Sequence, residues 1–327
     1  MQSNKVRYWS ITVALAGFLF GFDTVVISGA NQPIKALWQT DPWFHGTFIM
    51  SMALWGTVLG SLLGGIPTQR LGRKRTLFWI GVLYLVSALG SALAPDPYLF
   101  SFFRFIGGVG VGASSVAAPI YISEITTPEN RGRYGTLYQF NIVLGIFVAF
   151  ISNYLLEGVG GDNDWRFMLG VEALPALVYT LMVLGVSRSP RWLVLQKGEE
   201  AEAHEVLTAI SGSSTQADRL LAEIKASNQG EAQASEQVFI RKYRRLLWLA
   251  FLIAFFNQLS GINFILYYAP ELLERAGLAA KDSLGSSISI GAVNLIFTFV
   301  GVYLIDRAGR RSLLIWGFLL PSPNRLR

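Results

Sequence analysis

Residues 10–30 read SITVALAGFLFGFDTVVISGA, an apolar stretch of 21 residues with a single charged side chain, Asp23. A helix needs about 20 apolar residues to cross the hydrocarbon core of a bilayer, which is roughly 30 Å thick. The apolar core of a cleavable signal peptide is shorter, about 7–15 residues. This stretch therefore predicts a membrane-spanning helix that carries an acid inside the membrane.

The same kind of apolar run recurs along the chain. Seven more runs lie at about residues 47–67, 76–95, 98–122, 136–156, 167–187, 246–270 and 285–305. Their hydrophobic residues are continuous rather than alternating, which is typical of helices, and lipid requires every backbone polar group to be satisfied within the protein. We therefore predict an all-α integral membrane protein with about eight complete transmembrane helices.

The composition agrees with lipid as the solvent and excludes several classes of site. Only 15% of the residues are charged, whereas a soluble domain has about 25%. The chain lacks cysteine, so disulfides, thiolate nucleophiles and zinc–thiolate sites are excluded. Its two histidines, His45 and His204, fall on opposite sides of the membrane in the predicted topology, so we expect neither a metal site nor a cofactor.

Lysine and arginine residues gather in alternate loops. Clusters follow the second, fourth, sixth and eighth apolar runs, at residues 70–75, 131–133, 188–197 with 241–245, and 307–311. Cytoplasmic loops of membrane proteins carry this excess of cations, so the net charge of +6 indicates a membrane topology rather than a nucleic-acid partner. We expect a multi-pass protein of the cell membrane with a cytoplasmic N-terminus.

A short sequence pattern occurs twice. Residues 64–74 read GGIPTQRLGRK and residues 301–311 read GVYLIDRAGRR, each after an even-numbered run. A duplicated six-helix unit explains both positions. The predicted organisation is an N-terminal six-helix bundle at 1–187, a cytoplasmic central loop with short helices at 188–245, and an incomplete C-terminal bundle at 246–327.

The last apolar run is short. It begins at Ser312 and stops at Leu320, and its nine residues extend only ~13 Å as a helix. Such a stub cannot span a bilayer, so we expect the chain to be truncated within its C-terminal bundle.

Glycines recur at four-residue spacing within the predicted helices. Gly56, Gly60 and Gly64 form one stripe. Small residues allow helix backbones to approach closely in lipid, so this stripe predicts a close helix–helix contact.

Seven motifs follow one another along the chain: GFDTVVISGA (21–30), RLGRK (70–74), RFIGGVGVG (104–112), YISEITTPENRG (121–132), SPRWL (189–193), QLSGINFILYYAP (258–270) and DRAGRR (306–311). In sequence and in order they resemble the motifs of the sugar porter family of the major facilitator superfamily. The resemblance implies the major facilitator fold of twelve helices, of which this chain supplies eight and a stub. It also implies secondary transport of a monosaccharide by alternating access, by a monomer in the lipid bilayer, rather than enzymatic catalysis.

A carboxylate inside hydrocarbon is expensive, so Asp23 is a candidate functional residue from its position alone. In proton-coupled members of the family, the matching acid carries the proton and pairs with the arginine that matches Arg104. The resemblance therefore implies sugar–proton symport. A facilitative uniporter, a sugar sensor that does not transport, and an inactive truncated fragment remain the alternatives.

The sugar site is expected to combine amides, which both donate and accept hydrogen bonds, with aromatic faces. The resemblance implies sugar-binding roles for Phe20, Gln139, Asn257, Gln258, Asn263 and Asn294, and an outer gate at Tyr267 and Tyr268. Many relatives have glutamine where this chain has Asn257, and bacterial xylose carriers have a second glutamine where it has Ile146. These differences leave the preference among sugars open.

The resemblance also implies a network of charged residues on the cytoplasmic side, which holds the inner gate closed. Its members are Arg70, Arg73, Glu124, Arg131, Arg191, Asp306 and Arg310. Gln69 and Arg188 replace acids of the family pattern, so we expect a weaker latch than in relatives.

Overall fold

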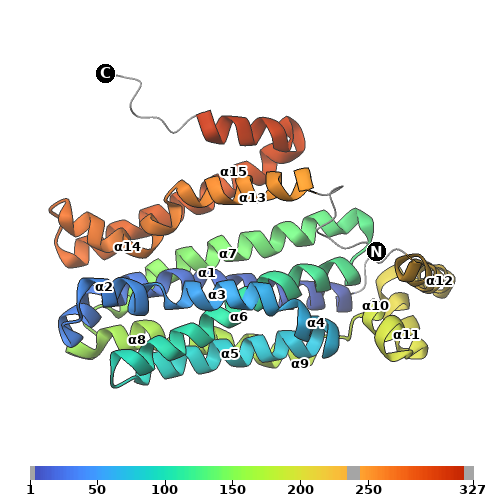
Figure 1. Ribbon diagram of the computed structural model, residues 1–327, viewed down its shortest axis with the longest axis horizontal. Helices are drawn as coiled ribbons and strands as arrows, with labels where there is room; N and C mark the ends of the chain where they lie inside the picture. The colour runs from blue at the N-terminus through green and yellow to red at the C-terminus, as the bar shows by residue number, and fades with distance from the viewer. Residues whose placement is uncertain (1–3, 234–243, 320–327) are drawn as a thin grey trace.

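The computed structural model describes residues 4–233 and 244–319, and helices make up almost all of them (Figure 1). The elements, in chain order, are α1 (Asn4–Trp38), α2 (Pro42–Phe44), η1 (His45–Met50), α3 (Met52–Leu63), α4 (Gly65–Arg70), α5 (Arg73–Leu93), α6 (Pro97–Ile125), α7 (Pro128–Leu156), η2 (Gly161–Asn163), α8 (Asp164–Gly170), α9 (Ala173–Leu184), α10 (Pro190–Trp192), η3 (Leu193–Lys197), α11 (Glu200–Ser211), α12 (Ser214–Gln233), α13 (Arg244–Leu259), α14 (Ile262–Arg275) and α15 (Ala280–Leu319).

Eight stretches of the described chain are long and apolar enough to cross a membrane, and each contains one of the eight predicted runs or most of it. They are Asn4–Trp38, Pro42–Leu63, Arg73–Leu93, Pro97–Ile125, Asn130–Leu156, Gly161–Leu184, Arg244–Arg275 and Ala280–Leu304. The prediction of an all-α membrane protein is confirmed. The first span is longer than predicted, because the helix continues past the apolar run at both ends.

Three of the spans are interrupted where the sequence predicted continuous helices. Within Pro42–Leu63, a bend at Ser51 separates η1 from α3. Within Arg244–Arg275, α13 and α14 are separated by Ser260 and Gly261, and Gly261 has a φ of +78° that glycine adopts without strain. Within Gly161–Leu184, Val171 and Glu172 separate α8 from α9. Broken helices in membrane proteins can place backbone and polar side chains at ligand sites. Gly261 leaves the helical conformation, whereas Val171 and Glu172 keep helical φ and ψ values.

The glycine stripe forms the predicted helix contact, between α3 and α6. A methyl group added at Gly60 would lie 2.9 Å from the Cα atom of Val109, and one added at Gly64 would lie 2.9 Å from the Cα atom of Ala113. These distances are too short for a side chain, so the two backbones pack directly against each other.

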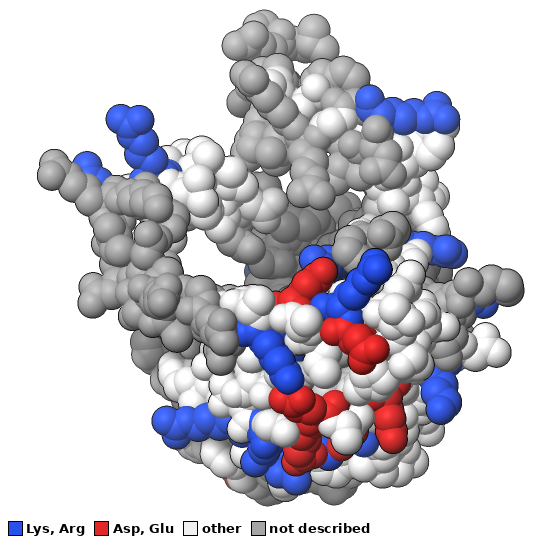
Figure 2. Space-filling view, turned by 90° about the vertical axis from the view of Figure 1, so that its right-hand side faces the viewer, with Lys and Arg blue, Asp and Glu red and all other residues white. Residues whose placement is uncertain are grey.

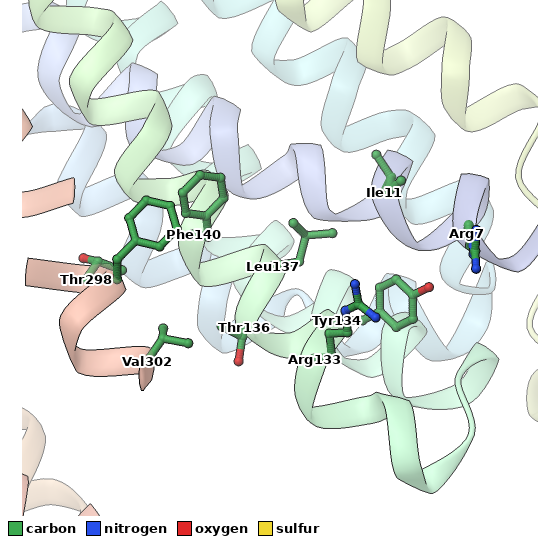
Figure 3. Close-up of a pocket in the computed structure, with 10 residues that line it drawn as sticks. Arg7, Ile11, Arg133, Tyr134, Thr136, Leu137, Phe140, Thr298 and Val302 are labelled. Carbon is green, nitrogen blue, oxygen red and sulfur yellow. The ribbon is translucent and has the colours of Figure 1, made fainter. Parts of the chain in front are cut away.

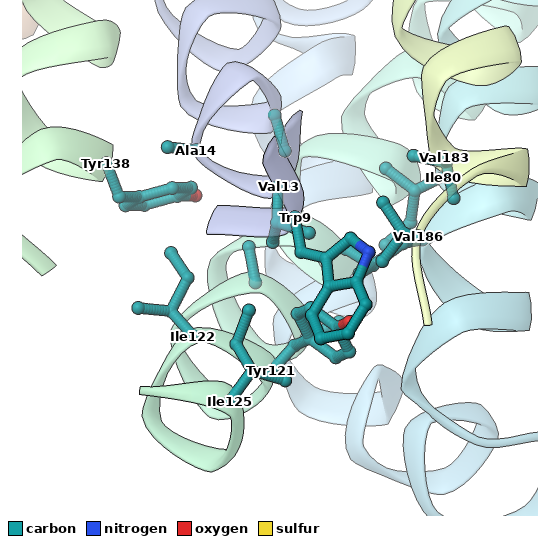
Figure 4. Close-up of a cluster of buried hydrophobic side chains, with 14 of the residues drawn as sticks. Trp9, Val13, Ala14, Ile80, Tyr121, Ile122, Ile125, Tyr138, Val183 and Val186 are labelled. Atoms are coloured by element: carbon teal, nitrogen blue, oxygen red, sulfur yellow. The ribbon is translucent and has the colours of Figure 1, made fainter. Parts of the chain in front are cut away.

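Buried apolar side chains join α1 to the helices around it. One cluster draws on α1, α5, α6, α7 and α9, and Figure 4 shows Trp9 surrounded by side chains from several of these helices. Its labelled members are Trp9, Val13, Ala14, Ile80, Tyr121, Ile122, Ile125, Tyr138, Val183 and Val186. Among the charged residues of α1, Asp23 is buried, whereas Lys5 and Arg7 near the start of the helix are exposed.

The helices α13–α15 lie along one side of this bundle (Figure 1). Contacts run from α14 to α1 and from α15 to α7, whereas α13 buries none of its residues. Its exposed apolar surface suits contact with lipid or with further helices. The short helices α10–α12 lie at one end of the bundle, and Figure 2 shows Lys, Arg, Asp and Glu side chains gathered on that end.

Candidate functional site

An ion pair lies inside the bundle between α1 and α6. The Nη1 atom of Arg104 is 2.5 Å from Oδ1 of Asp23, and Nη2 of Arg104 donates a second hydrogen bond of 3.1 Å to the backbone oxygen of Asp23. Only 2% of the Arg104 side chain and 3% of the Asp23 side chain are exposed. The structure thus brings together the two residues that the sequence proposed for proton coupling, and it shields them from solvent.

Glu172 is a second buried acid near this pair, and it was not among the residues predicted from the sequence. It is 2% exposed at the break between α8 and α9, and it interacts with both Asp23 and Arg104. Its Oε1 atom has no hydrogen-bond partner among the described residues. Glu172 lies inside the apolar run at 167–187, so the signal that identified Asp23 could also have found it.

These three side chains can hold a proton. Two carboxyl groups lie near one guanidinium in a region with almost no exposure, Asp23 in an ion pair with Arg104 and Glu172 without one among the described residues, and unbalanced charge is costly there. The cluster is electrically neutral when one of the two carboxyl groups is protonated. Asp23 accepts the short hydrogen bond from Arg104, so Glu172 is the carboxyl group whose charge is less well stabilised.

Tyr267, from α14, belongs to a buried apolar cluster that includes Phe22 and Val25 of α1, the residues on either side of Asp23 and Thr24. It is buried and interacts electrostatically with both Arg104 and Asp23. The sequence placed it at an outer gate together with Tyr268, which is half-buried. In the structure Tyr267 packs α14 against the part of α1 that carries Asp23.

The six candidate sugar-binding residues are only partly brought together. The side chain of Asn263 donates a hydrogen bond of 2.7 Å to Oε1 of Gln258, across the break at Gly261. Gln139 and Asn257 are exposed, as is Gln258, while Phe20, Asn263 and Asn294 are half-buried. None of the six lines the cavity of about 500 Å³ shown in Figure 3, although Phe140, next to Gln139, does.

A hydrogen-bonded chain at the opposite end from α10–α12 was not predicted. His45 has a buried ring. Its Nε2 atom is 2.8 Å from Oδ1 of Asn31, and its Nδ1 atom is 2.9 Å from the hydroxyl oxygen of Thr40. The amide of Asn31 donates to Glu271 on α14 at 2.8 Å. Since the Asn31 oxygen can only accept, the pattern is satisfied when His45 Nε2 carries the proton and Nδ1 accepts from Thr40.

Several of the charged residues that the sequence proposed for the cytoplasmic network lie near α10–α12. Arg73 binds Glu124 through two hydrogen bonds of 2.9 and 2.8 Å, and the Ser189 hydroxyl donates to the same carboxylate at 2.6 Å. Arg131 and Arg191 line one cavity together with Glu124. Arg70 is exposed, and the side chains of Asp306 and Arg310 lie outside the described residues.

Arg188 has acidic partners that were not predicted from the sequence. Its guanidinium forms ion pairs with Glu202 and, at 2.7 Å, with Glu199. The hydrogen bond with Glu202 and the charge of both acids raise the pKa of Arg188 above its usual value. Arg188, which replaces an acid of the family pattern, therefore connects the loop after α9 to α11 through these ion pairs.

The family described as "Sugar (and other) transporter" matches residues 9–321 of the chain. Two similar relatives are the arabinose-proton symporter of Bacillus subtilis, 35% identical over 314 residues, and the glucose transport protein of Synechocystis, 36% identical over 318 residues. These alignments cover 94% and 93% of this chain and 67% of each relative, so the chain spans about two thirds of their length.

The fold is similar to solved structures of the xylose transporter XylE from E. coli. A partially occluded inward open form matches with a TM-score of 0.85 and 30% identity, over 97% of this chain and 76% of that one. The proton:xylose symporter XylE bound to 6-bromo-6-deoxy-D-glucose matches with a TM-score of 0.84 and 29% identity, over 98% of this chain and 73% of that one.

Proposed function

Since the chain belongs to the sugar transporter family, we propose that it carries a monosaccharide across the membrane together with a proton, by alternating access. The observation that carries this proposal is the buried ion pair of Asp23 and Arg104. Ionisable residues within membrane spans are costly and mark ion or proton pathways. The family and its solved neighbours are transporters, so the chain is a transporter and not an enzyme.

The proposed proton step uses the three charged groups of the cluster. An ionised Asp23 accepts from Arg104 and holds α1 against α6. A proton that binds Asp23 removes its negative charge, and the guanidinium then needs another anion, because an unpaired buried charge is strongly unfavourable. Glu172 is the neighbouring acid and becomes this anion by releasing its own proton. When a proton enters at Asp23 and another is released at Glu172, the guanidinium of Arg104 thus shifts from Asp23 on α1 to Glu172 between α8 and α9.

The proposed sugar site centres on the break between α13 and α14. Gln258 and Asn263 lie on either side of Gly261 and are already hydrogen-bonded to each other. Each amide retains further donors and acceptors, which suit sugar hydroxyls. Relatives are named for arabinose, glucose and xylose, so a monosaccharide is the proposed substrate class. Phe20, Gln139, Asn257 and Asn294 are the further proposed contacts.

We propose that the protein lies in the cell membrane as a monomer, with its N-terminus and α10–α12 in the cytoplasm. The loops rich in lysine and arginine support this orientation. The bidentate pair of Arg73 and Glu124 then lies at the inner side, where it holds the inner ends of α5 and α6 together. The hydrogen bond between Asn31 and Glu271 lies at the outer side.

Uptake of labelled sugar by sealed vesicles that contain the chain tests the proposal. An inward proton gradient should drive accumulation, and an uncoupler should abolish it. Asp23→Asn should lose accumulation but retain exchange of sugar, whereas Asp96→Asn, at the N-cap of α6, should behave like the wild type. Undiminished accumulation by Asp23→Asn would contradict the symport mechanism, and a wild-type chain without any uptake would contradict transport by this chain.

A further inference from the structure

A crevice of about 500 Å³ lies between α1, α7 and α15 (Figure 3). Its walls are mostly apolar, with Leu137 and Phe140 from α7 facing Phe299 and Val302 from α15. The rings of Phe140 and Phe299 are 5.0 Å apart between centroids and join the two walls. The crevice therefore lies between the first bundle and the helices that follow the central loop.

One end of the crevice is cationic. Figure 3 shows Arg7 and Arg133 at the same end, on either side of Tyr134, whereas Phe140, Thr298 and Val302 lie at the other end. Both arginine side chains are exposed, and each lies close to the N-terminal end of its helix, α1 or α7. In the orientation proposed above, this end lies at the cytoplasmic surface of the membrane. The crevice thus changes from cationic at the surface to apolar at depth.

This lining does not suit a sugar. The ten residues that line the crevice include no amide and no carboxylate side chain, and their hydroxyl groups belong to Tyr134, Thr136 and Thr298. A sugar needs donors and acceptors arranged around several hydroxyls, which the apolar walls do not supply. An anionic headgroup attached to a hydrocarbon chain matches both ends of the crevice.

We propose that the crevice binds an anionic phospholipid from the cytoplasmic leaflet. The phosphate lies between Arg7 and Arg133, and one acyl chain lies along Leu137, Phe140 and Val302. Basic pockets between transmembrane helices on the cytoplasmic side bind anionic headgroups in this way, and the leaflet itself supplies such lipids. The proposal rests on the orientation given under Proposed function and not on any transport activity.

A lipid in this position acts on both parts of the protein. It contacts α1 and α7 on one side and α15 on the other. On α15, the Thr298 hydroxyl donates a hydrogen bond of 2.8 Å to the backbone oxygen of Asn294, one turn away. Asn294 is itself a proposed sugar contact. On α7, Gln139 is adjacent to Phe140. Lipid occupancy therefore favours arrangements in which these two helices remain apart at the cytoplasmic end.

Native mass spectrometry of the purified chain with phosphatidylglycerol or phosphatidylcholine tests this site. The wild type should retain one phosphatidylglycerol more tightly than phosphatidylcholine. The double variant Arg7→Gln/Arg133→Gln should weaken phosphatidylglycerol binding about tenfold or more, because each basic side chain near the headgroup contributes to affinity. The control pair Arg75→Gln/Arg244→Gln removes the same charge from exposed arginines outside the crevice and should bind like the wild type.

A second variant separates the crevice from simple surface charge. Ile11→Trp/Val302→Trp fills the apolar part and leaves both arginines in place, and it should also lose the tightly held lipid. Unchanged binding in this variant or in Arg7→Gln/Arg133→Gln would overturn the proposal, as would an equal loss in the control pair. The arginine variants change exposed side chains, so their result stands even if the tryptophan variant does not fold. Because lipid binding needs no sugar or proton movement, failure of the proposed transport would leave this result unaffected.

Discussion

Asn31 on α1 and Glu271 on α14 are 240 residues apart in the sequence, and the Asn31 amide donates a hydrogen bond of 2.8 Å to the Glu271 carboxylate. Asn31 is buried and also accepts from His45, so both ends of its side chain are used. This contact connects the first bundle to α14 at the end opposite α10–α12. In an alternating-access transporter, a polar contact of this kind can open when one part moves against the other.

We expect Asn31→Ala to lower the free energy of unfolding by about 1–2 kcal/mol. Interhelical hydrogen bonds in membranes contribute about 0.6 kcal/mol on average and about 1.7 kcal/mol at most. Asn31 makes two such bonds. Chemical denaturation in detergent measures this loss. Arg275→Ala removes the exposed partner of the same Glu271 carboxylate. It should change the free energy of unfolding by only a few tenths of a kcal/mol.

A double-mutant cycle between Asn31→Ala and Glu271→Gln isolates the contact itself. The coupling should be at least about 0.5 kcal/mol, as for residues that touch. A coupling of zero would show that the hydrogen bond contributes nothing to the joining of α1 and α14.

A second prediction concerns where the proton of the buried cluster is held. Asp23 receives the short hydrogen bond from Arg104, whereas Oε1 of Glu172 has no partner among the described residues. We therefore expect the infrared spectrum to contain the C=O band of a buried protonated carboxyl group, and Glu172→Gln to remove it. Glu124→Gln alters an acid that is paired with Arg73 and should leave the band in place. Persistence of the band in Glu172→Gln would contradict the assignment.

The sequence identified the central ion pair because each partner carries its own signal. Asp23 is an acid within an apolar run, and Arg104 begins a glycine-rich motif at the corresponding position of the family. Glu172 carries the same signal as Asp23 and was predictable. The contact of Asn31 with Glu271 was not predictable. An asparagine near the end of a span indicates no partner until the structure places α14 beside it.

The helix runs were predictable from hydrophobicity, whereas their interruptions depend on tertiary structure. Gly261 lies in an apolar motif, and hydrophobicity alone does not distinguish a continuous helix from two helices separated by a left-handed glycine. Likewise, the family pattern predicted that Arg188 removes an anion from the latch. It could not show that Glu199 and Glu202 of α11 would lie within reach of its guanidinium.

A third prediction tests the proposed sugar contact at the break between α13 and α14. Gln258→Ala removes an amide that is hydrogen-bonded to Asn263 and available to a hydroxyl group. Loss of one such bond should weaken sugar binding by a factor of about 2 to 10, since a hydrogen bond contributes about 0.5–1.5 kcal/mol. Tryptophan fluorescence titration of the purified chain measures the change. Gln69→Ala, at an exposed position of α4, should bind sugar as the wild type does. Equal affinities of all three proteins would count against Gln258.

The last prediction tests the close contact of α3 with α6. A methyl group at Gly60 would meet the backbone of Val109, which cannot move without shifting α6, whereas one at Gly65 would have no heavy atom within 4 Å. Overpacking of this kind typically destabilises by about 1–3 kcal/mol. In thermal unfolding in detergent, we therefore expect Gly60→Ala to unfold at a lower temperature and Gly65→Ala to match or slightly exceed the wild type, because alanine favours helix. If the two variants unfold at the same temperature, backbone contact does not hold these helices together.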